Sequence, residues 1–152
     1  MLNFLKKQVA LLWARKHVRK AGASGNNPVQ NQETLLLELV RKAEKTLFGR
    51  ERGFENIRSV KDFQAKVAVS DYEDIKPYIE RMKKGQANIL WPDIPEYFAK
   101  TSGTTSGSKY IPISHEGMPF QVAGAQSALF HYIAQKNNAD FVGGKMIFLQ
   151  GS

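Results

Sequence analysis

Hydrophobic residues recur at helical spacing in the first part of the chain. Residues 1–20 and residues 33–48 each carry apolar side chains three or four positions apart, which is typical of helices with one buried face. Gly49 is the expected stop of the second helix, and residues 21–31 have the composition of a loop. The periodic positions are Leu2, Leu5, Val9, Leu12 and Trp13 in the first helix and Leu36, Leu39, Val40, Ala43 and Leu47 in the second.

Two serine-to-acid capping patterns predict further helices and make residues 32–85 a helical region. Ser59–Asp62 precedes a short helix over residues 60–66, and Ser70–Glu73 precedes a longer one that ends near residue 85. Pro77 lies inside the longer helix, so we expect a kink or a restart there. We interpret the acids of its first turn, Glu73 and Asp74, as partners of the helix dipole rather than as acid/base catalysts.

Short apolar segments alternate with a long helical pattern in residues 86–152. Ser114 is the expected N-cap of a helix over residues 115–135, which ends at Asn137. This alternation of strands and helices indicates an α/β layer. The expected extended segments or strands are Ile89–Trp91, Tyr97–Ala99, Tyr110–Ile113 and Lys145–Gln150, the last being of the buried type.

The stretch between the second and third of these segments is unusually rich in small polar residues. Residues 101–109 read TSGTTSGSK and combine hydroxyl side chains and two glycines with a terminal lysine. Glycine permits a positive φ and a close approach of a ligand to the main chain. Successive N–H groups in such a loop form a concavity that suits an anion, usually phosphate. The pattern therefore predicts a strand–loop–strand hairpin that binds a nucleotide.

The composition of the loop has two other interpretations. A Walker P-loop has four residues between its glycines and a lysine directly after the second glycine. Here three residues separate Gly103 from Gly107, and Ser108 precedes Lys109. A Walker loop also opens a helix, whereas Tyr110–Ile113 resembles a strand. The other interpretation, a Ser/Thr/Gly connector without a ligand, stays open on composition alone.

The same residues carry a resemblance to a known group of enzymes. The TSGTTSGSK loop resembles the phosphate-binding motif of the adenylate-forming superfamily, which includes firefly luciferase and acyl-CoA synthetases. The flanking blocks are similar to the auxin-responsive promoter family of acyl acid–amido synthetases. These blocks are LFGRERGF (47–54), SDYEDIKPYI (70–79), ILWP (89–92), FAKTSGTT (98–105), SKYIPIS (108–114) and GKMIFLQGS (144–152).

The resemblance implies a ligase that activates a carboxylic acid with ATP and Mg²⁺, releases pyrophosphate and transfers the acyl group to an amino acid. A thiol acceptor, as in acyl-CoA synthetases, is the alternative. It also implies that the chain is part of the large N-terminal α/β domain of such an enzyme, after an N-terminal helical segment. By resemblance, Lys109 is the catalytic residue. The residues that would hold the triphosphate are Ser102, Gly103, Thr104, Thr105, Ser106, Gly107 and Lys109.

Two features depart from the family's pattern. The loop is one residue shorter between Thr105 and Lys109, which changes the reach of the lysine. The family's adenine-binding and Mg²⁺-coordinating motifs and its acyl pocket lie beyond the position of Ser152. We therefore interpret residues 1–152 as an incomplete N-terminal portion of one adenylate-forming domain, inactive as this chain alone and without the magnesium ligands.

Composition and charge limit the expected cellular location of the chain and the classes of partner that it is expected to bind. The chain is 42% hydrophobic and contains no cysteine, which excludes disulfides and thiolate zinc sites and fits the cytoplasm. The net charge is +8, but residues 1–32 contain six basic residues and no acidic one. The remaining residues have a net charge of only +2, so a distributed basic face for nucleic acid is not expected.

The basic N-terminal helix has three interpretations. We favour packing of its Leu/Trp stripe on the domain that follows. An organelle presequence and a helix that docks on an anionic membrane surface are the alternatives. The second functional hypothesis for the chain is therefore a non-catalytic module that binds a membrane or a partner through residues 1–20. The histidines, His17, His115 and His131, are not at metal-ligand spacing, and Ser114–His115 lacks a third catalytic member.

Overall fold

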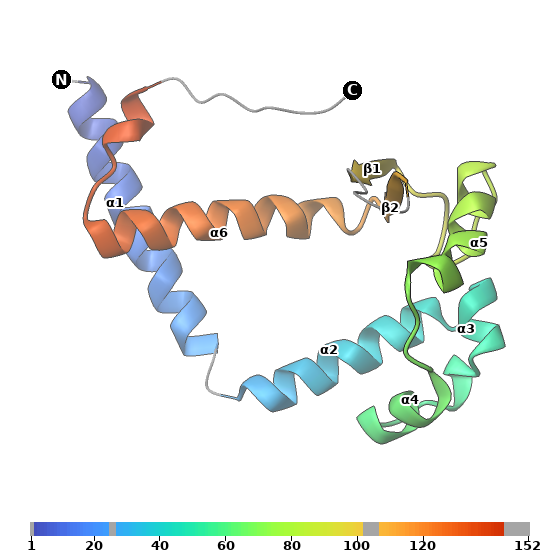
Figure 1. Cartoon of the computed structure of the whole chain (residues 1–152). Helices are drawn as coiled ribbons and strands as arrows, with labels where there is room; N and C mark the ends of the chain where they lie inside the picture. Colours follow the sequence, from blue (N-terminus) through green and yellow to red (C-terminus); the bar gives the residue numbers. More distant parts are fainter. Residues whose placement is uncertain (1, 25–26, 102–106, 145–152) are drawn as a thin grey trace. The chain divides into compact units, whose positions relative to one another are not determined.

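The computed structural model describes residues 2–24, 27–101 and 107–144 (Figure 1). The chain divides into two compact units, of which unit 1 comprises residues 1–27 and 119–152 and unit 2 comprises residues 28–118. The elements are α1 (Leu2–Ser24), α2 (Pro28–Ala43), α3 (Leu47–Glu51), η1 (Phe54–Asn56), α4 (Val60–Lys66), α5 (Tyr72–Lys83), β1 (Tyr97–Thr101), β2 (Lys109–Ile113), α6 (Met118–Lys136) and η2 (Asp140–Gly143).

The described residues are mostly helical, with a two-stranded antiparallel sheet formed by β1 and β2. The expected strands on either side of the polar loop are confirmed. Residues Ile89–Trp91, expected as a strand or an extended segment, form bends and no strand. The strand expected at Lys145–Gln150 lies outside the described residues. Beyond the hairpin, the predicted α/β layering is thus not seen in the part of the chain that the structure describes.

The core of unit 2 lies where α2, α3, η1 and α4 meet. Its buried residues are Val40, Ala43, Phe54 and Ile57. The rings of Phe48 and Phe54 meet edge to face, with centroids 5.8 Å apart, which is a favoured aromatic geometry. Partly buried side chains complete this cluster: Leu36, Leu37, Phe48, Phe63, Val67 and Trp91.

The junction between α2 and α3 departs from the sequence prediction. We expected one helix to stop at Gly49, but α2 ends at Ala43 and Gly49 lies inside α3. Thr46 is the N-cap of α3 and is 1% exposed. Its hydroxyl donates to the carbonyl oxygen of Ala43 (2.7 Å) and accepts from the amide of Gly49 (3.0 Å). A buried hydroxyl with both partners satisfied therefore defines the break.

The segment Asn88–Ile89 closes the first turn of α3 instead of forming a strand. The amide of Leu47 donates to the carbonyl oxygen of Asn88 (2.8 Å), and that of Phe48 donates to Ile89 (3.0 Å). The first amides of a helix have no partner within the helix, so these two bonds satisfy them. The buried side chain of Ile89 fixes the segment beside the core.

Helix α5 begins one residue later than the sequence pattern predicts. Asp71, not Ser70, is the N-cap, and its carboxylate accepts from the amides of Glu73 (2.8 Å) and Asp74 (3.1 Å). The carboxylate of Asp74 accepts from the amide of Asp71 (3.0 Å), which completes a capping box. Glu73 and Asp74 both lie in the first turn of α5, which confirms their interpretation as residues that stabilise the start of the helix. The helix runs through Pro77 without a restart.

Helix α4 begins at the predicted cap, whereas α6 begins at Met118, three residues later than a cap at Ser114 predicts. The hydroxyl of Ser59 accepts from the amide of Asp62 at 3.1 Å, as expected. Hydrogen bonds from Ser59 and then from the amide of Arg58 lower the pKa of Asp62. The hydroxyl of Ser114 accepts from the amide of Gly117 (3.0 Å) in a turn that leads into α6. Asn137, with a φ of 50°, follows the last residue of α6.

Unit 1 packs through small side chains of α1. Ala14 is fully buried against Ile133 of α6 and Ala139. Ion pairing between Lys7 and Asp140 (2.7 Å) adds a contact to η2 and lowers the pKa of Asp140. Within unit 1 the Leu/Trp stripe is open to solvent, because Leu5, Leu12 and Trp13 are 60%, 64% and 66% exposed, and its packing on the domain that follows stays a prediction. None of the described helices has the length and apolar character that a membrane span needs.

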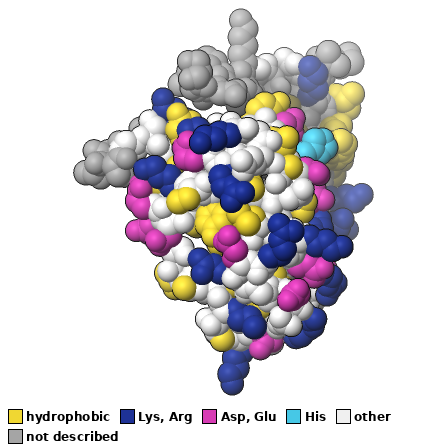
Figure 2. All heavy atoms as spheres, turned by 90° about the vertical axis from the view of Figure 1, so that its right-hand side faces the viewer, with side chains coloured by type: hydrophobic (Ala, Val, Ile, Leu, Met, Phe, Trp, Pro, Cys, Tyr) yellow, Lys and Arg dark blue, Asp and Glu magenta, His cyan; other side chains and the backbone are white. Residues whose placement is uncertain are grey.

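The surface seen in Figure 2 carries basic and acidic side chains side by side rather than in blocks of one sign. This mixture agrees with the near balance of charge in residues 33–152. Eight of the 22 basic residues but only one of the 14 acidic residues belong to unit 1. The positive charge of the chain is therefore concentrated in unit 1.

Candidate functional site

The polar loop joins two paired strands of unit 2. Strands β1 and β2 are antiparallel, with Tyr97 opposite Ile113 and Thr101 opposite Lys109. The two ends of the loop are therefore direct cross-strand neighbours, as the strand–loop–strand prediction requires. Of the predicted site residues, Gly107 and Lys109 are described, whereas Ser102, Gly103, Thr104, Thr105 and Ser106 lie outside the described residues.

Gly107 has a backbone conformation that favours glycine. Its φ is +84°, and a Cβ built there would meet no atom of the described residues within 4 Å. The requirement for glycine is thus conformational and not a matter of space. An open position beside the main chain is also compatible with close approach of a ligand.

Lys109 begins β2 and carries its ammonium group over an aromatic ring. Its Nζ lies 5.3 Å from the ring centroid of Tyr72, the first residue of α5. The residue is half-buried. In the part of the chain that is described, no carboxylate forms an ion pair with Lys109. The charge is therefore held in place without being neutralised.

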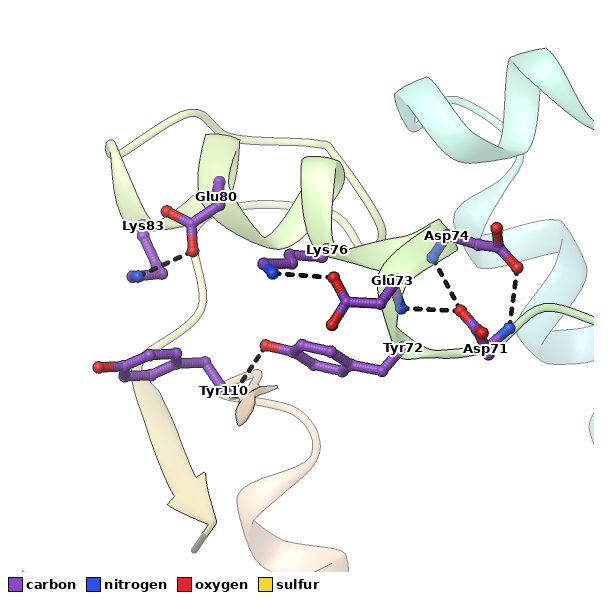
Figure 3. Close-up of polar contacts among 8 residues, drawn as sticks. All are labelled: Asp71, Tyr72, Glu73, Asp74, Lys76, Glu80, Lys83 and Tyr110. Atoms are coloured by element: carbon purple, nitrogen blue, oxygen red, sulfur yellow. Dashed lines mark hydrogen bonds and ion pairs between the residues drawn. The ribbon is translucent and has the colours of Figure 1, made fainter. Parts of the chain in front are cut away.

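Two neighbouring lysines of α5 have carboxylate partners on the same helix (Figure 3). Lys76 pairs with Glu73 (2.8 Å) and Lys83 pairs with Glu80 (2.9 Å). The hydrogen bond from each lysine to its glutamate raises the pKa of that lysine. These two lysines are already matched by local carboxylates, unlike Lys109 in the described part of the chain.

Helix α5 also holds the strand that follows the loop. The amide of Tyr110 donates to the hydroxyl of Tyr72 at 2.8 Å, and Nζ of Lys83 lies 4.1 Å from the ring centroid of Tyr110 (Figure 3). The backbone of β2 next to Lys109 is therefore tied to a capped helix. Sequence reasoning missed these residues, because 38 positions separate Tyr72 from Tyr110 and no local pattern links them.

Other chemistry considered from the sequence has little support in the described residues. No group of three or more histidine, aspartate or glutamate side chains there could hold a metal ion. The hydroxyl of Ser114 accepts a backbone hydrogen bond, and His115 is exposed. Two of the histidines, His17 and His131, lie on either side of the hydroxyl of Ser127, at 3.0 and 3.4 Å.

Comparison with known protein families gives a match over most of the chain. Residues 19–150 match the model of the GH3 family N-terminal domain. The chain belongs to the GH3 family. The resemblance to the auxin-responsive acyl acid–amido synthetases is thereby confirmed.

Two GH3 relatives from Arabidopsis thaliana match part of the chain. Indole-3-acetic acid-amido synthetase GH3.2 is 31% identical over 94 residues, which cover 60% of this chain and 17% of that protein. Indole-3-acetic acid-amido synthetase GH3.3 is 29% identical over 89 residues, which cover 57% of this chain and 15% of that protein. The matched region thus spans about a sixth of the length of these relatives.

Proposed function

We propose that this chain is the N-terminal part of an ATP-dependent acyl acid–amido synthetase and forms the phosphate-binding hairpin of its active site. The observation that carries the proposal is the position of Lys109, at the end of the hairpin loop and without an anionic partner among the described residues. Membership of the GH3 family supports the reaction class, because the two matched relatives are named amido synthetases.

The reaction has two steps. A carboxylate oxygen attacks the α-phosphorus of ATP, the bond to the bridging oxygen breaks, and pyrophosphate leaves with the electron pair. The amine of an amino acid then attacks the acyl carbon, AMP leaves, and the amine loses a proton to give the amide. The hairpin acts in the first step, where negative charge accumulates on the departing pyrophosphate.

Each residue of the loop has a role in this proposal. Backbone amides at Gly103 and Gly107 and the hydroxyls of Ser102, Thr104, Thr105 and Ser106 would donate to the β- and γ-phosphates. Lys109 would supply the positive charge. Mg²⁺ would accompany the ATP, but the described residues contain no suitable carboxylate cluster, so we assign it no ligands here.

Nucleotide binding by the 152-residue chain is the first measurement. We expect ATP, tripolyphosphate and pyrophosphate to compete for one site and AMP to compete poorly, because the loop contacts the β- and γ-phosphates. In a longer protein that contains this chain, pyrophosphate exchange into ATP should require a carboxylic acid. Offering an amino acid and a thiol in parallel distinguishes amide from thioester formation. A longer protein that neither binds ATP nor exchanges pyrophosphate would overturn the proposal.

A second candidate function, binding to an anionic membrane surface, is favoured by the exposed apolar face of unit 1. Leu5, Val9 and Trp13 of α1 line a groove of about 640 Å³ together with Leu129 and Phe141. The unit carries an excess of basic residues. Apolar side chains with basic neighbours complement the headgroups and the acyl boundary of an anionic bilayer.

Vesicle binding tests this second function. We expect the chain to bind phosphatidylserine vesicles at low salt, to bind phosphatidylcholine vesicles weakly, and to dissociate at high salt. Trp13→Ser should weaken binding about tenfold or more by removing an exposed aromatic surface that the bilayer would bury, whereas Trp91→Phe in unit 2 should have no effect. Equal binding to both lipids, or self-association that covers the groove in their absence, would refute it.

A further inference from the structure

Tyr72 makes two contacts with consecutive residues at the end of the loop. Its hydroxyl accepts a hydrogen bond from the amide of Tyr110 at 2.8 Å. The centroid of its ring lies 5.3 Å from Nζ of Lys109. One side chain therefore contacts both the backbone that carries the site and the ammonium group of the proposed catalytic lysine.

The hydroxyl of Tyr72 gives the Tyr110 amide a partner outside the hairpin. Tyr110 lies opposite Lys100 in the two-stranded sheet, yet its amide donates to α5. In a two-stranded sheet both strands are edges, and their outward amides need water or another partner. The hydroxyl of Tyr72 is that partner, and it ties β2 to α5 one residue after Lys109.

The ring contact restrains Lys109 without competing for its charge. An aromatic face attracts an ammonium group but carries no net charge, so a phosphate can still bind. A carboxylate in the same place would pair with the lysine, as Glu73 does with Lys76 and Glu80 does with Lys83. The ring of Tyr72 is therefore suited to orient a cation whose partner is a ligand.

Tyr72 is itself well fixed. It is the first residue of α5, directly after the Asp71 cap, and the capping box with Asp74 defines how the helix starts (Figure 3). Farther along the helix, the side chains of Ile79 and Met82 are buried in the interior of unit 2. The two contacts of Tyr72 thus connect Lys109 to a rigid element rather than to another loop.

We propose that Tyr72 is a positioning residue for the phosphate-binding hairpin, which sets the backbone of β2 through its hydroxyl and the ammonium group of Lys109 through its ring. This inference rests on the proposed function. The inference predicts that the hydroxyl and the ring of Tyr72 act separately. One variant can therefore remove the hydroxyl alone, and another can remove both.

The experiment compares Tyr72→Phe and Tyr72→Leu in the 152-residue chain with tripolyphosphate as the probe. Tyr72→Phe removes the hydroxyl only. We expect hydrogen exchange of the Tyr110 amide to accelerate about threefold to tenfold, and tripolyphosphate to bind more weakly by a factor in the same range. Tyr72→Leu also removes the ring and should weaken binding about twofold to fivefold further. Tyr97→Phe, on the exposed face of β1, is the matched control and should behave like the wild type.

A double variant separates positioning from general stability. If the ring acts through Lys109, the additional loss in Tyr72→Leu relative to Tyr72→Phe should vanish in a Lys109→Ala background. A merely structural role would leave that loss unchanged and would overturn the inference. It would also be overturned if Tyr72→Phe left both Tyr110 exchange and tripolyphosphate binding at wild-type values. Failure of Lys109→Ala to weaken binding would instead refute the proposed function, so the two failures can be distinguished.

Discussion

Gly49→Ala is expected to destabilise unit 2 by about 3 kcal/mol, the upper end of the range for overpacking. A Cβ at this position would lie 2.0 Å from the carbonyl oxygen of Ala43 and 3.0 Å from Cα of Glu44. These are backbone atoms at the end of α2, which cannot rotate away as a side chain would. The clash would also separate the amide of Gly49 from the hydroxyl of Thr46, the cap of α3.

The direction of the change makes this a sharp test. Helix propensity alone predicts that alanine stabilises a helical position by about 1 kcal/mol relative to glycine. Gly124→Ala in α6, where a Cβ meets nothing within 4 Å, should show that ordinary gain. Urea unfolding followed by the fluorescence of Trp91 in a Trp13→Phe background reports on unit 2, and circular dichroism reports on both variants. An unchanged or higher midpoint for Gly49→Ala would contradict the packing described here.

Gly49 also shows where sequence reasoning fails. A glycine after an apolar helical pattern is a common C-terminal signal, and the pattern of residues 33–48 favoured that interpretation. The structure instead uses the missing side chain to bring two helix ends together. Such a close approach depends on the path of the chain between α2 and α3, which periodicity does not encode.

The N-cap of α5 was mispredicted for a different reason. Ser70 and Asp71 each have an acid three residues later, and Ser70–Glu73 matches the usual capping-box pattern better than Asp71–Asp74 does. The choice depends on which residue adopts the extended conformation where the chain enters the helix, and that residue is Asp71. The prediction of a helix here was correct, and its first residue was wrong by one.

The hairpin was predictable because its signals are local. Apolar strands, two glycines and a terminal lysine all lie within residues 97–113, and they indicated a hairpin, although its register, with Thr101 opposite Lys109, was not predicted. The support for Lys109 was not predictable, since it comes from Tyr72 in another element. The same holds for α1, where Ala14, rather than the exposed Leu5 and Leu12, is fully buried against Ile133 of α6.

Lys109→Ala is tested in a longer protein that contains this chain. It should lower the exchange of pyrophosphate into ATP that requires a carboxylic acid substrate about a hundredfold to a thousandfold. Loss of one well-placed donor to charge developing in a transition state has an effect of this size. The loss should appear mainly in kcat, because negative charge develops on the leaving pyrophosphate as the bond between the α-phosphorus and the bridging oxygen breaks, and not when ATP binds. Lys109→Arg should recover only part of the rate, since a planar guanidinium cannot replace a compact ammonium at the same point.

Lys100→Ala supplies the matched control for this variant. Lys100 lies on β1 of the same hairpin, opposite Tyr110, and its side chain is exposed. Both variants remove one positive charge, so a general electrostatic attraction of ATP would affect them alike and would depend strongly on salt. A loss confined to Lys109→Ala, with little dependence on salt, would identify a specific contact. Equal losses in the two variants would show that the hairpin attracts the nucleotide but does not take part in breaking the α–β bond.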